Sequence, residues 1–349
     1  CFTSPTLSQT GKFYWALCTY ITFTTLYTII AIPVGSLIPA MTQDRDERTS
    51  LASFRYLGAS SGSISVAVLT LPLVGLFSSP QYGFPITVAI LAFFGAIFAF
   101  LCFYHTEEKY SKTYEKRVSV KDLLRMVFSN FPLHLVILAL LTTWIANNIK
   151  QITVIYFVKY NLQLEAFFSP ILLSVILQIM FGAFLINLIK HKFEKKTLFM
   201  IGTFLYVITD LIIYYITGYE NFWLFAFVAS FGFVGFGMAG VMAWSMIADT
   251  VEYGEWKSGF RAEGTLNAAH VFVFKLSVGF SAWLAGYILD RTNYKPNAEI
   301  QSIDTLNGLF IMGYIFPAIA GTIAIIVMLF HNYNGAFYEK IFSELKQRQ

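Results

Sequence analysis

Charged residues are scarce in this chain. Asp, Glu, Lys and Arg together make up 13% of its 349 residues, whereas soluble domains carry about 25%. Hydrophobic residues make up 56%, and Phe alone contributes 36 residues. This composition excludes an ordinary soluble domain. It predicts a polytopic membrane protein of the all-α fold class.

Cysteine is also rare, and motifs for catalysis are missing. The three cysteines, Cys1, Cys18 and Cys102, lack the CxxC spacing of a redox or metal site. The sequence has no HExxH or Walker motif. These absences argue against an enzyme, a metal site and an ATP-driven pump, and we expect no cofactor. The net charge of +4 is spread over short loops, so no nucleic-acid partner is expected.

Long apolar runs fill most of the chain. A helix needs about 20 apolar residues to cross a bilayer, and nine runs reach that length. The predicted spans are Tyr14–Met41, Phe54–Leu76, Phe84–Tyr104, Phe131–Val158, Ala166–Ile189, Thr197–Ile216, Phe222–Ile247, Thr265–Leu289 and Leu309–Phe330. We therefore expect a multi-pass protein whose main surroundings are the lipid bilayer.

The basic residues predict its orientation. Of the 24 Lys and Arg residues, seventeen fall on one set of alternate connections and four on the other. Positive residues favour the cytoplasmic side. The sequence thus predicts an N-terminus outside, a C-terminus in the cytoplasm, and a location in the cell membrane.

The longest connection and the tail carry further local signals. Ser119, followed by Asp122, resembles a helix N-cap with an acid at the third helical position. This predicts a short surface helix at about Val120–Val127. In the tail, Phe337, Ile341 and Leu345 recur with charges between them. We expect this segment to lie along the inner membrane surface or to be a solvated, frayed tail.

Three cations interrupt the apolar runs: Arg55, Lys150 and Lys275. A charge at the centre of a bilayer costs at least about 2.5–3.5 kcal/mol. It persists where it faces a partner or a water-filled cavity. Three such charges far apart in the sequence predict a polar cavity inside the helical bundle, and thereby the movement of a polar solute.

Three stretches carry a resemblance to a known family. The first reads DTVEYGEWK from Asp249 to Lys257, with RAEG following from Arg261. The second reads YTIIAIP from Tyr27 to Pro33, and the third reads DRDER from Asp44 to Arg48, followed by Arg55. From about residue 14 to 330 the chain resembles the glycoside–pentoside–hexuronide:cation symporters of the major facilitator superfamily, which include the melibiose permease.

The resemblance implies the major-facilitator fold with nine of its twelve transmembrane helices. Residues 1–105 match spans four to six of the N-terminal half, and residues 106–130 form a cytoplasmic loop between the halves. Residues 131–331 match the six-helix C-terminal half, and residues 332–349 form a cytoplasmic tail. The implied protein is a monomeric symporter. It couples the entry of a cation, sodium or proton, to the uptake of a sugar, glycoside or uronide by alternating access.

The resemblance also implies site residues. Thr28 matches a cation-binding threonine, and the carboxylates of the family's cation site lie on span two, before the matched part. Arg55 matches a sugar-contacting arginine, although an arginine near a span end also reaches the interface by itself. Lys275 matches a lysine of the central cavity. The chain departs from the family at Ala31, which stands where its best-studied member has a sugar-binding aspartate.

Two more departures are Gly35 and Gly240, which stand where that member has tryptophans. These changes make a melibiose-like galactoside a poor expectation for the substrate.

Helical spacing adds candidates for the substrate site. Asn147 and Lys150 share one face of their span, which predicts either a cavity lining or a hydrogen-bonded staple between helices. His270 shares a broad face with Lys275 and is a candidate for substrate binding, for proton coupling or for a structural hydrogen bond. Tyr27 is a candidate for stacking on a sugar ring, with core packing as the alternative. Asp210 lies toward the outer end of its span and is left out of the predicted site.

The charged motifs predict a cytoplasmic gate. Arg45, Arg48, Asp249, Glu252 and Arg261 carry both signs of charge on connections of the same side. Ion pairs among them would hold the two halves together. The alternative interpretation is a pair of solvated loops.

Two other functions stay open. A lipid or amphiphile transporter of related fold would need a long apolar cleft beside the charged residues. A membrane sensor or an intramembrane enzyme would bind without net flux or would release a product. Because no acid on the nine spans is an obvious partner for all three buried cations, the sequence favours a uronide or another acidic glycoside as substrate.

Overall fold

The computed structural model describes Thr3, Pro5 and residues 7–109, 119–296, 298–332 and 335–347. Within these ranges nine helices are long and apolar enough to cross a membrane, in agreement with the nine predicted spans. They are α1 (Gln9–Met41), α2 (Arg45–Gly75), α3 (Pro80–His105), α5 (Phe131–Tyr156), α6 (Phe168–Ile189), α7 (Lys195–Ile212), α8 (Phe222–Ser258), α9 (Glu263–Arg291) and α10 (Ile303–Leu329). Short pieces of wider or tighter helix, Phe157–Asn161, Glu165–Phe167 and Ile213–Thr217, extend α5, begin α6 and extend α7.

Side-chain caps fix where several helices begin. The Asp44 carboxylate accepts a hydrogen bond from the Glu47 amide at 2.8 Å and starts α2. The Asn130 side chain accepts from the Leu133 amide at 3.1 Å and starts α5. Such caps satisfy amide groups that a helix start leaves without an internal partner.

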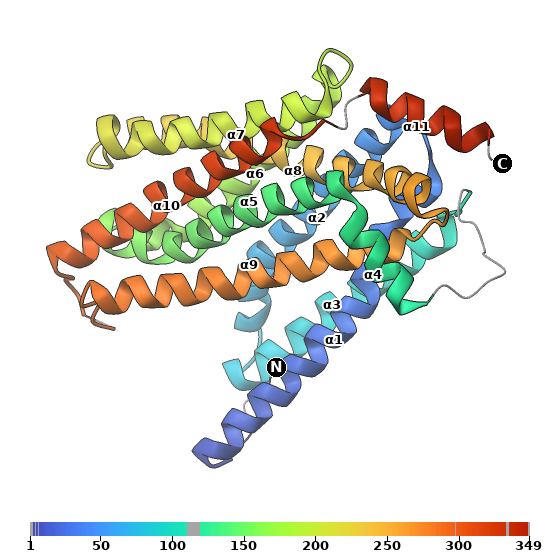
Figure 1. Ribbon diagram of the computed structural model, residues 1–349. Coiled ribbons are helices and arrows are strands. Elements are labelled where there is room, and N and C mark those ends of the chain that lie inside the picture. Colours follow the sequence, from blue (N-terminus) through green and yellow to red (C-terminus); the bar gives the residue numbers. More distant parts are fainter. Residues whose placement is uncertain are drawn as a thin grey trace.

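The six helices α5–α10 form one closely packed bundle (Figure 1). Close approach of α6 to α8 depends on glycine, because a Cβ at Gly182 or Gly237 would overlap a carbonyl oxygen of the facing helix. Small residues of this kind let membrane helices pack at short range.

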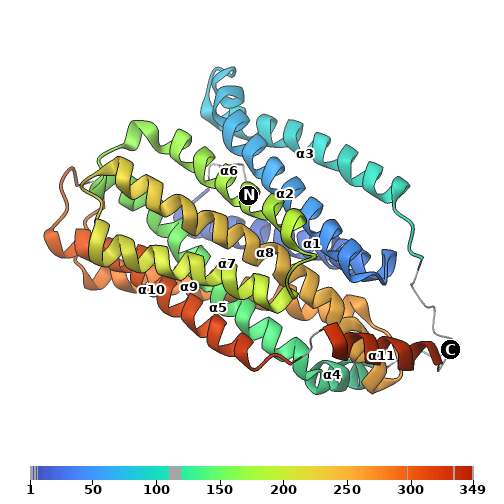
Figure 2. The same cartoon turned by 90° about the horizontal axis from the view of Figure 1, so that it is seen from above.

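The three helices α1–α3 lean away from this bundle at one end and meet it at the other (Figures 1 and 2). The contacts between the two parts run from α1 to α9 and from α2 to α6 and α8. They involve the half of each helix that lies nearest the charged segments. Farther along α2, a Cβ at Gly58 or Gly62 would meet no atom within 4 Å, so the halves are apart there.

The short helices show one correct and one wrong expectation. Helix α4 (Val120–Ser129) starts at Ser119, whose side chain accepts from the Asp122 amide, as the sequence predicted. Helix α11 (Gly335–Gln347) is a regular helix rather than a frayed tail, and its apolar face is covered by protein. Its buried residues Tyr338, Ile341 and Leu345 pack against the end of α8, because that end presents an apolar surface of its own.

The predicted span limits were too narrow at two charged segments. Helix α2 begins at Arg45 rather than near Phe54, and α8 continues to Ser258 rather than ending near Ile247. The charged stretch after Ile247 is therefore mostly helical, and its side chains are held by partners instead of water. Four basic residues used for the orientation, Lys112, Lys116, Arg117 and Arg348, lie outside the described ranges, as does Cys1.

Candidate functional site

A polar cluster lies where α1 and α2 meet α8 and α9. The Arg55 guanidinium stacks over the Trp244 ring, with 4.2 Å between its central carbon and the ring centroid. The His270 ring lies edge-on to Trp244, with centroids 4.3 Å apart. Tyr27 and His270 are both close enough to Arg55 to interact with it electrostatically. The structure thus brings together three residues predicted for the substrate site, from α1, α2 and α9.

Several polar atoms of this region have no partner among the residues described. They are Arg55 Nη1, Trp144 Nε1, Asn267 Oδ1 and both ring nitrogens of His270. We call these four residues and Trp244 the junction cluster: Arg55, Trp144, Trp244, Asn267 and His270. A buried polar group without a partner is unfavourable, so these atoms mark the place where a polar ligand or water fits best.

Lys275 and Thr28 lie in direct contact across the two halves. The Lys275 amine donates to the Thr28 hydroxyl and to the Thr24 carbonyl, the latter at 3.2 Å. The residue predicted to bind the cation and a residue predicted to bind the substrate are therefore neighbours. Because the Lys275 ammonium is positively charged, it would repel a coupling cation that approached Thr28.

The glycines that replace tryptophan have a structural use here. A Cβ at Gly35 would overlap the side-chain amide of Asn267, which donates to the Ile32 carbonyl at 2.8 Å. A Cβ at Gly240 would lie 2.7 Å from the ring of Tyr56. Both glycines admit a side chain from the opposite half, so they allow the halves to come close.

Lys150 does not belong to the junction cluster. Its amine forms an ion pair with Asp210 of α7 and lies 4.5 Å from the Tyr206 ring centroid and 5.1 Å from that of Tyr314. Asp210, which was left out of the predicted site, is therefore the acidic partner of Lys150, a pairing that the sequence did not make obvious. Asn147, on the same face, is buried inside the bundle. Whether Lys150 and Asn147 contact substrate stays a prediction, and the geometry favours a staple between helices.

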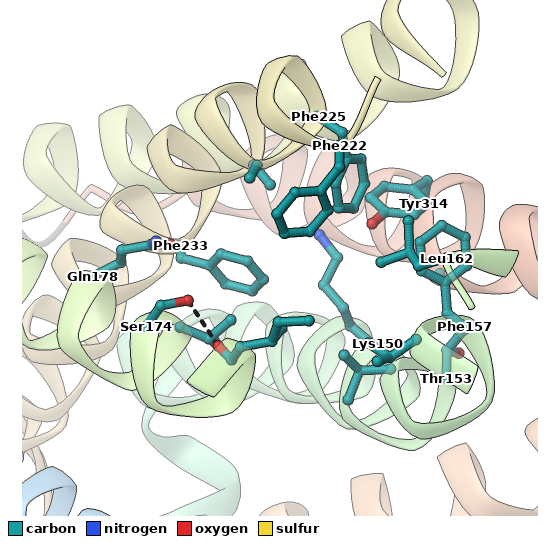
Figure 3. A pocket seen from close by; sticks show the side chains of 17 residues that line it. Lys150, Thr153, Phe157, Leu162, Ser174, Gln178, Phe222, Phe225, Phe233 and Tyr314 are labelled. Atoms are coloured by element: carbon teal, nitrogen blue, oxygen red, sulfur yellow. Dashed lines mark hydrogen bonds between the residues drawn. The ribbon is translucent and has the colours of Figure 1, made fainter. Parts of the chain in front are cut away.

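The Lys150 amine borders a small apolar chamber of about 90 Å³ between α5, α6, α8 and α10. Figure 3 shows it pointing between the rings of Phe222, Phe225 and Tyr314. Gln178 of α6 reaches the chamber from the other side, and its Oε1 atom is buried without a partner in the described part of the chain. Sequence spacing gave no signal for this chamber, because its walls come from four separate helices.

The five residues predicted for the gate form one network. Arg48 is fully buried and donates to both carboxylate oxygens of Glu252, at 2.8 Å in the longer contact. Arg45 lies 3.4 Å and Arg48 3.5 Å from Asp249, and Arg261 lies 3.3 Å from Glu252. These contacts join α2 to α8 and to the segment between α8 and α9. A solvated loop is therefore the wrong interpretation of this motif.

Sequence reasoning missed several members of the network, Lys195 and Tyr338 among them. Lys195, at the start of α7, donates to both oxygens of Asp249 at 2.9 and 2.7 Å. Tyr338 of α11 accepts from Arg48 at 3.3 Å and donates to the Gln43 carbonyl at 3.1 Å. Lys195 was counted only as a positive charge, and Tyr338 stood in a tail expected to face the membrane.

The electrostatics of the network follow from its packing. Burial lowers the pKa of the Arg261 guanidinium, but Glu252 and Glu263 outweigh it and raise the pKa above its usual value. Burial and nearby Glu252 raise the pKa of the Tyr338 phenol well above its usual range. Both groups therefore keep one protonation state at physiological pH, and the network does not titrate through them.

Comparison with known proteins gives a consistent result. The sequence profile of the family described as MFS/sugar transport protein matches residues 1–335. The uncharacterized symporter YjmB of Bacillus subtilis (strain 168) is 31% identical over 334 residues, which cover 94% of this chain and 72% of that protein. A putative sulfoquinovose importer of Escherichia coli (strain K12) is 30% identical over 351 residues, covering 100% and 74%. The isoprimeverose transporter of Lactiplantibacillus pentosus is 27% identical over 354 residues, covering 100% and 73%.

A solved structure shows the same fold. The fucose:proton symporter FucP of E. coli superposes with a TM-score of 0.61 at 12% identity, covering 87% of this chain and 73% of that one. At so low an identity the likeness concerns the fold alone. This shared fold and the profile match over nearly all of the chain lead to one conclusion. The chain is a multi-pass membrane protein with the major-facilitator fold, and it belongs to the MFS/sugar transport protein family.

Proposed function

We propose that the protein is a cation-coupled symporter of the glycoside–pentoside–hexuronide type, which takes up a sugar or glycoside by alternating access. The observation that carries the proposal is the junction cluster. It offers donors and acceptors without partners at the contact between the two halves, beside the half-buried ring of Trp244, which packs against Arg55 and His270. A sugar ring presents hydroxyls at its rim and an apolar face, which fits a site of this kind.

The gate network supports the alternating-access part. It closes one end of the contact between the halves, and the helices diverge toward the other end (Figure 1). By the positive-inside rule the closed end is cytoplasmic. The arrangement then corresponds to an outward-facing state, from which the network must open to release substrate inside.

The charge of the substrate is proposed from Arg55. In the described ranges no carboxylate pairs with this guanidinium, and guanidinium binds carboxylates and sulfonates through paired hydrogen bonds. One relative is named as a putative 2,3-dihydroxypropane-1-sulfonate exporter, and it is 29% identical over 360 residues. We therefore favour an acidic glycoside such as a uronide. Lys150 no longer contributes to this argument, because Asp210 neutralises it.

The coupling cation is proposed from the resemblance. Thr28 matches the cation-binding threonine, and the carboxylates that complete that site belong to a span before the part that this chain matches. If spans one to three are absent, residues 1–349 should bind substrate without coupled flux. Intact protein with those spans should couple.

Uptake in vesicles tests the proposal. Proteoliposomes with protein that carries the cation-site span together with residues 1–349, under an imposed sodium or proton gradient, should accumulate a labelled glucuronide, and collapse of the gradient should abolish accumulation. Arg55→Gln should weaken binding of the glucuronide more than that of the matching glucoside. Equal losses for both substrates would reject the acidic substrate, and a lack of gradient-dependent uptake would reject the symporter.

The apolar chamber favours one alternative, an amphiphile transporter. Its walls are mostly aromatic and aliphatic, with the Lys150 amine at one edge. Saturable uptake of a lysophospholipid, undiminished by sugars, would support this alternative over the symporter.

A further inference from the structure

We propose that the pocket between the start of α2 and the connection from α6 to α7 binds the headgroup of an anionic phospholipid. The pocket lies beside the gate network and apart from the junction cluster, so its occupation does not depend on which solute the protein carries. Because its walls come from both halves, a bound headgroup stabilises the state in which this end of the protein is closed.

The pocket is large enough for a headgroup. Its volume of about 340 Å³ lies within the usual range for small-molecule sites, about 300–1,000 Å³. Arg45, Asp46 and Thr49 of α2 form one wall, residues 190–195 form the other, and Met242 of α8 adds apolar surface. The connection lies at the same end of the molecule as the start of α2 and helix α11 (Figure 1).

Basic side chains outnumber acidic ones in this lining by five to two. The basic ones are Arg45, Lys190, His191, Lys192 and Lys195. Both carboxylates already have a basic partner, because Asp46 lies 2.9 Å from His191 and Glu194 lies 3.7 Å from Arg45. Asp249, the nearest carboxylate of α8, is held by Lys195 at 2.7 Å. The acids of this region are therefore in use, and positive charge is left over.

The remaining charge belongs to two lysines without an acidic partner in the described part of the chain. The Lys190 amine donates to the Asp46 carbonyl at 2.9 Å and to the Ser50 hydroxyl, which leaves one of its three N–H donors for a ligand. Lys192 is exposed, and its amine forms no ion pair or hydrogen bond with a described residue. Two ammonium groups of this kind suit the charged oxygens of a phosphodiester, which accept strong hydrogen bonds from cations.

The position of the pocket favours a lipid over a free phosphate. Helix α6 ends at Ile189 and α7 begins at Lys195, so the connection turns directly between two spans at the level of the lipid headgroups. Leu188 and Phe193 beside the pocket are 60% and 48% exposed, and such apolar side chains suit acyl chains. By the positive-inside rule this end faces the cytoplasm, and basic pockets between spans on that side bind anionic headgroups.

A headgroup in this pocket joins the two halves. Arg45 belongs to α2, whereas Lys190 and Lys192 follow α6, and the contact of Lys190 with α2 exists only while the halves are close. Separation of the halves at this end would pull the two walls apart. A ligand that binds one of two states better shifts the equilibrium toward that state, so the lipid favours the closed end.

Lipid titration of the intact protein in detergent tests the site. Native mass spectrometry measures the affinity of the first bound phosphatidylglycerol, with zwitterionic phosphatidylcholine as the comparison. A charge near an anionic lipid contributes about fivefold, so a change of two charges should lower phosphatidylglycerol affinity about thirtyfold. We expect this loss for Lys190→Gln with Lys192→Gln, and separately for Lys192→Glu, without a change for phosphatidylcholine. Since Lys192 has no contact to lose, Lys192→Glu decides the matter even if the double variant does not fold.

A charge-matched control separates the pocket from general attraction. Lys121→Gln with Arg125→Gln removes two positive charges from exposed positions of α4 and should leave the affinity unchanged. Equal losses in the control and the pocket variants, or equal affinity for both lipids, would overturn the site. Displacement of phosphatidylglycerol by an equal concentration of inorganic phosphate would assign the pocket to a free anion and overturn the lipid assignment.

Cysteine labelling tests the effect on the closed state. The Ser245 hydroxyl shares a hydrogen bond with Thr49 across the halves, so Ser245→Cys, in protein whose other cysteines are replaced by serine, reports on their separation. Nanodiscs with equal parts of phosphatidylglycerol and phosphatidylcholine should slow maleimide labelling relative to phosphatidylcholine alone, and Lys192→Glu should remove the difference. The same rate in both lipids would overturn the joining of the halves by the headgroup.

Discussion

Removal of the Arg48 guanidinium should open the end of the protein that the gate network closes, which we propose to be the cytoplasmic end. Arg48 is 0% exposed and binds Glu252 through two nitrogens. Removing one member of a buried ion pair costs about 3–5 kcal/mol. Glu252 would keep Arg261 at 3.3 Å, so we expect the low end, about 3 kcal/mol. Arg48 and Glu252 both become hydrated when the halves separate, so the loss applies only to the closed state. It therefore shifts the equilibrium between the closed and open states about a hundredfold toward the open state.

Labelling of a buried cysteine measures this shift. Ser245 is fully buried and shares a 3.0 Å hydrogen bond with Thr49 across the two halves, so Ser245→Cys reports on separation. The cysteines Cys1, Cys18 and Cys102 are first replaced by serine. In inside-out vesicles, Arg48→Ala should then raise the rate at which an impermeant maleimide labels this position.

Two comparisons protect the interpretation. Arg45→Ala should have an effect below about 1 kcal/mol, because the Arg45 side chain is 19% exposed and Asp249 keeps Lys195 as a partner. The double variant Arg48→Leu, Glu252→Leu should label more slowly than Arg48→Ala, since it leaves no unpaired carboxylate. Equal labelling rates at Ser245→Cys with and without Arg48→Ala would refute the view that these ion pairs hold this end closed.

Further predictions concern the staple, the glycine contact and acid stability. Asp210→Ala should lower the free energy of unfolding by about 3–5 kcal/mol, because it leaves the Lys150 charge unpaired, whereas Lys150→Gln should not change the uronide-to-glucoside binding ratio. Gly35→Trp should force Asn267 away from α1 and weaken the contact between the halves, which thermal unfolding in detergent would show as a lower midpoint. Burial, with Lys196 nearby, lowers the pKa of the His331 imidazole to about 4 from its ordinary value of about 6.5. His331 therefore contributes full stability above pH 6.5 and loses it as pH falls toward 4, by up to about 3 kcal/mol, and His331→Gln should flatten this part of the pH profile; an unchanged slope would contradict the prediction.

The sequence by itself determined the number and rough position of the spans. Every backbone polar group inside a bilayer must find an internal partner, so a long apolar run has little choice but to form a helix. The start of α4 at Ser119 was also decided locally, because a cap acts within one turn. The family match then followed from motifs whose residues lie close together along the chain, such as Asp249 to Lys257.

The same motifs pointed to the gate without revealing its form. Arg48, Asp249 and Glu252 were predicted to act together, and the structure places them in one network. That α8 continues through this stretch was not predicted, because a run of mixed charges looks the same whether water or other side chains surround it. Lys195 and Tyr338 joined the network only through the packing of α7 and α11.

Tertiary structure alone decided the partners of the buried charges. Lys150 and Asp210 lie on separate helices, sixty residues apart, and no local pattern states that α5 and α7 bring them together. The contact of Asn267 with α1 through Gly35 and the chamber beside α8 have the same origin. Helical periodicity tells which side chains share a face, whereas the neighbour of that face is set by how whole helices pack, which depends on the shapes of surfaces distant in the sequence.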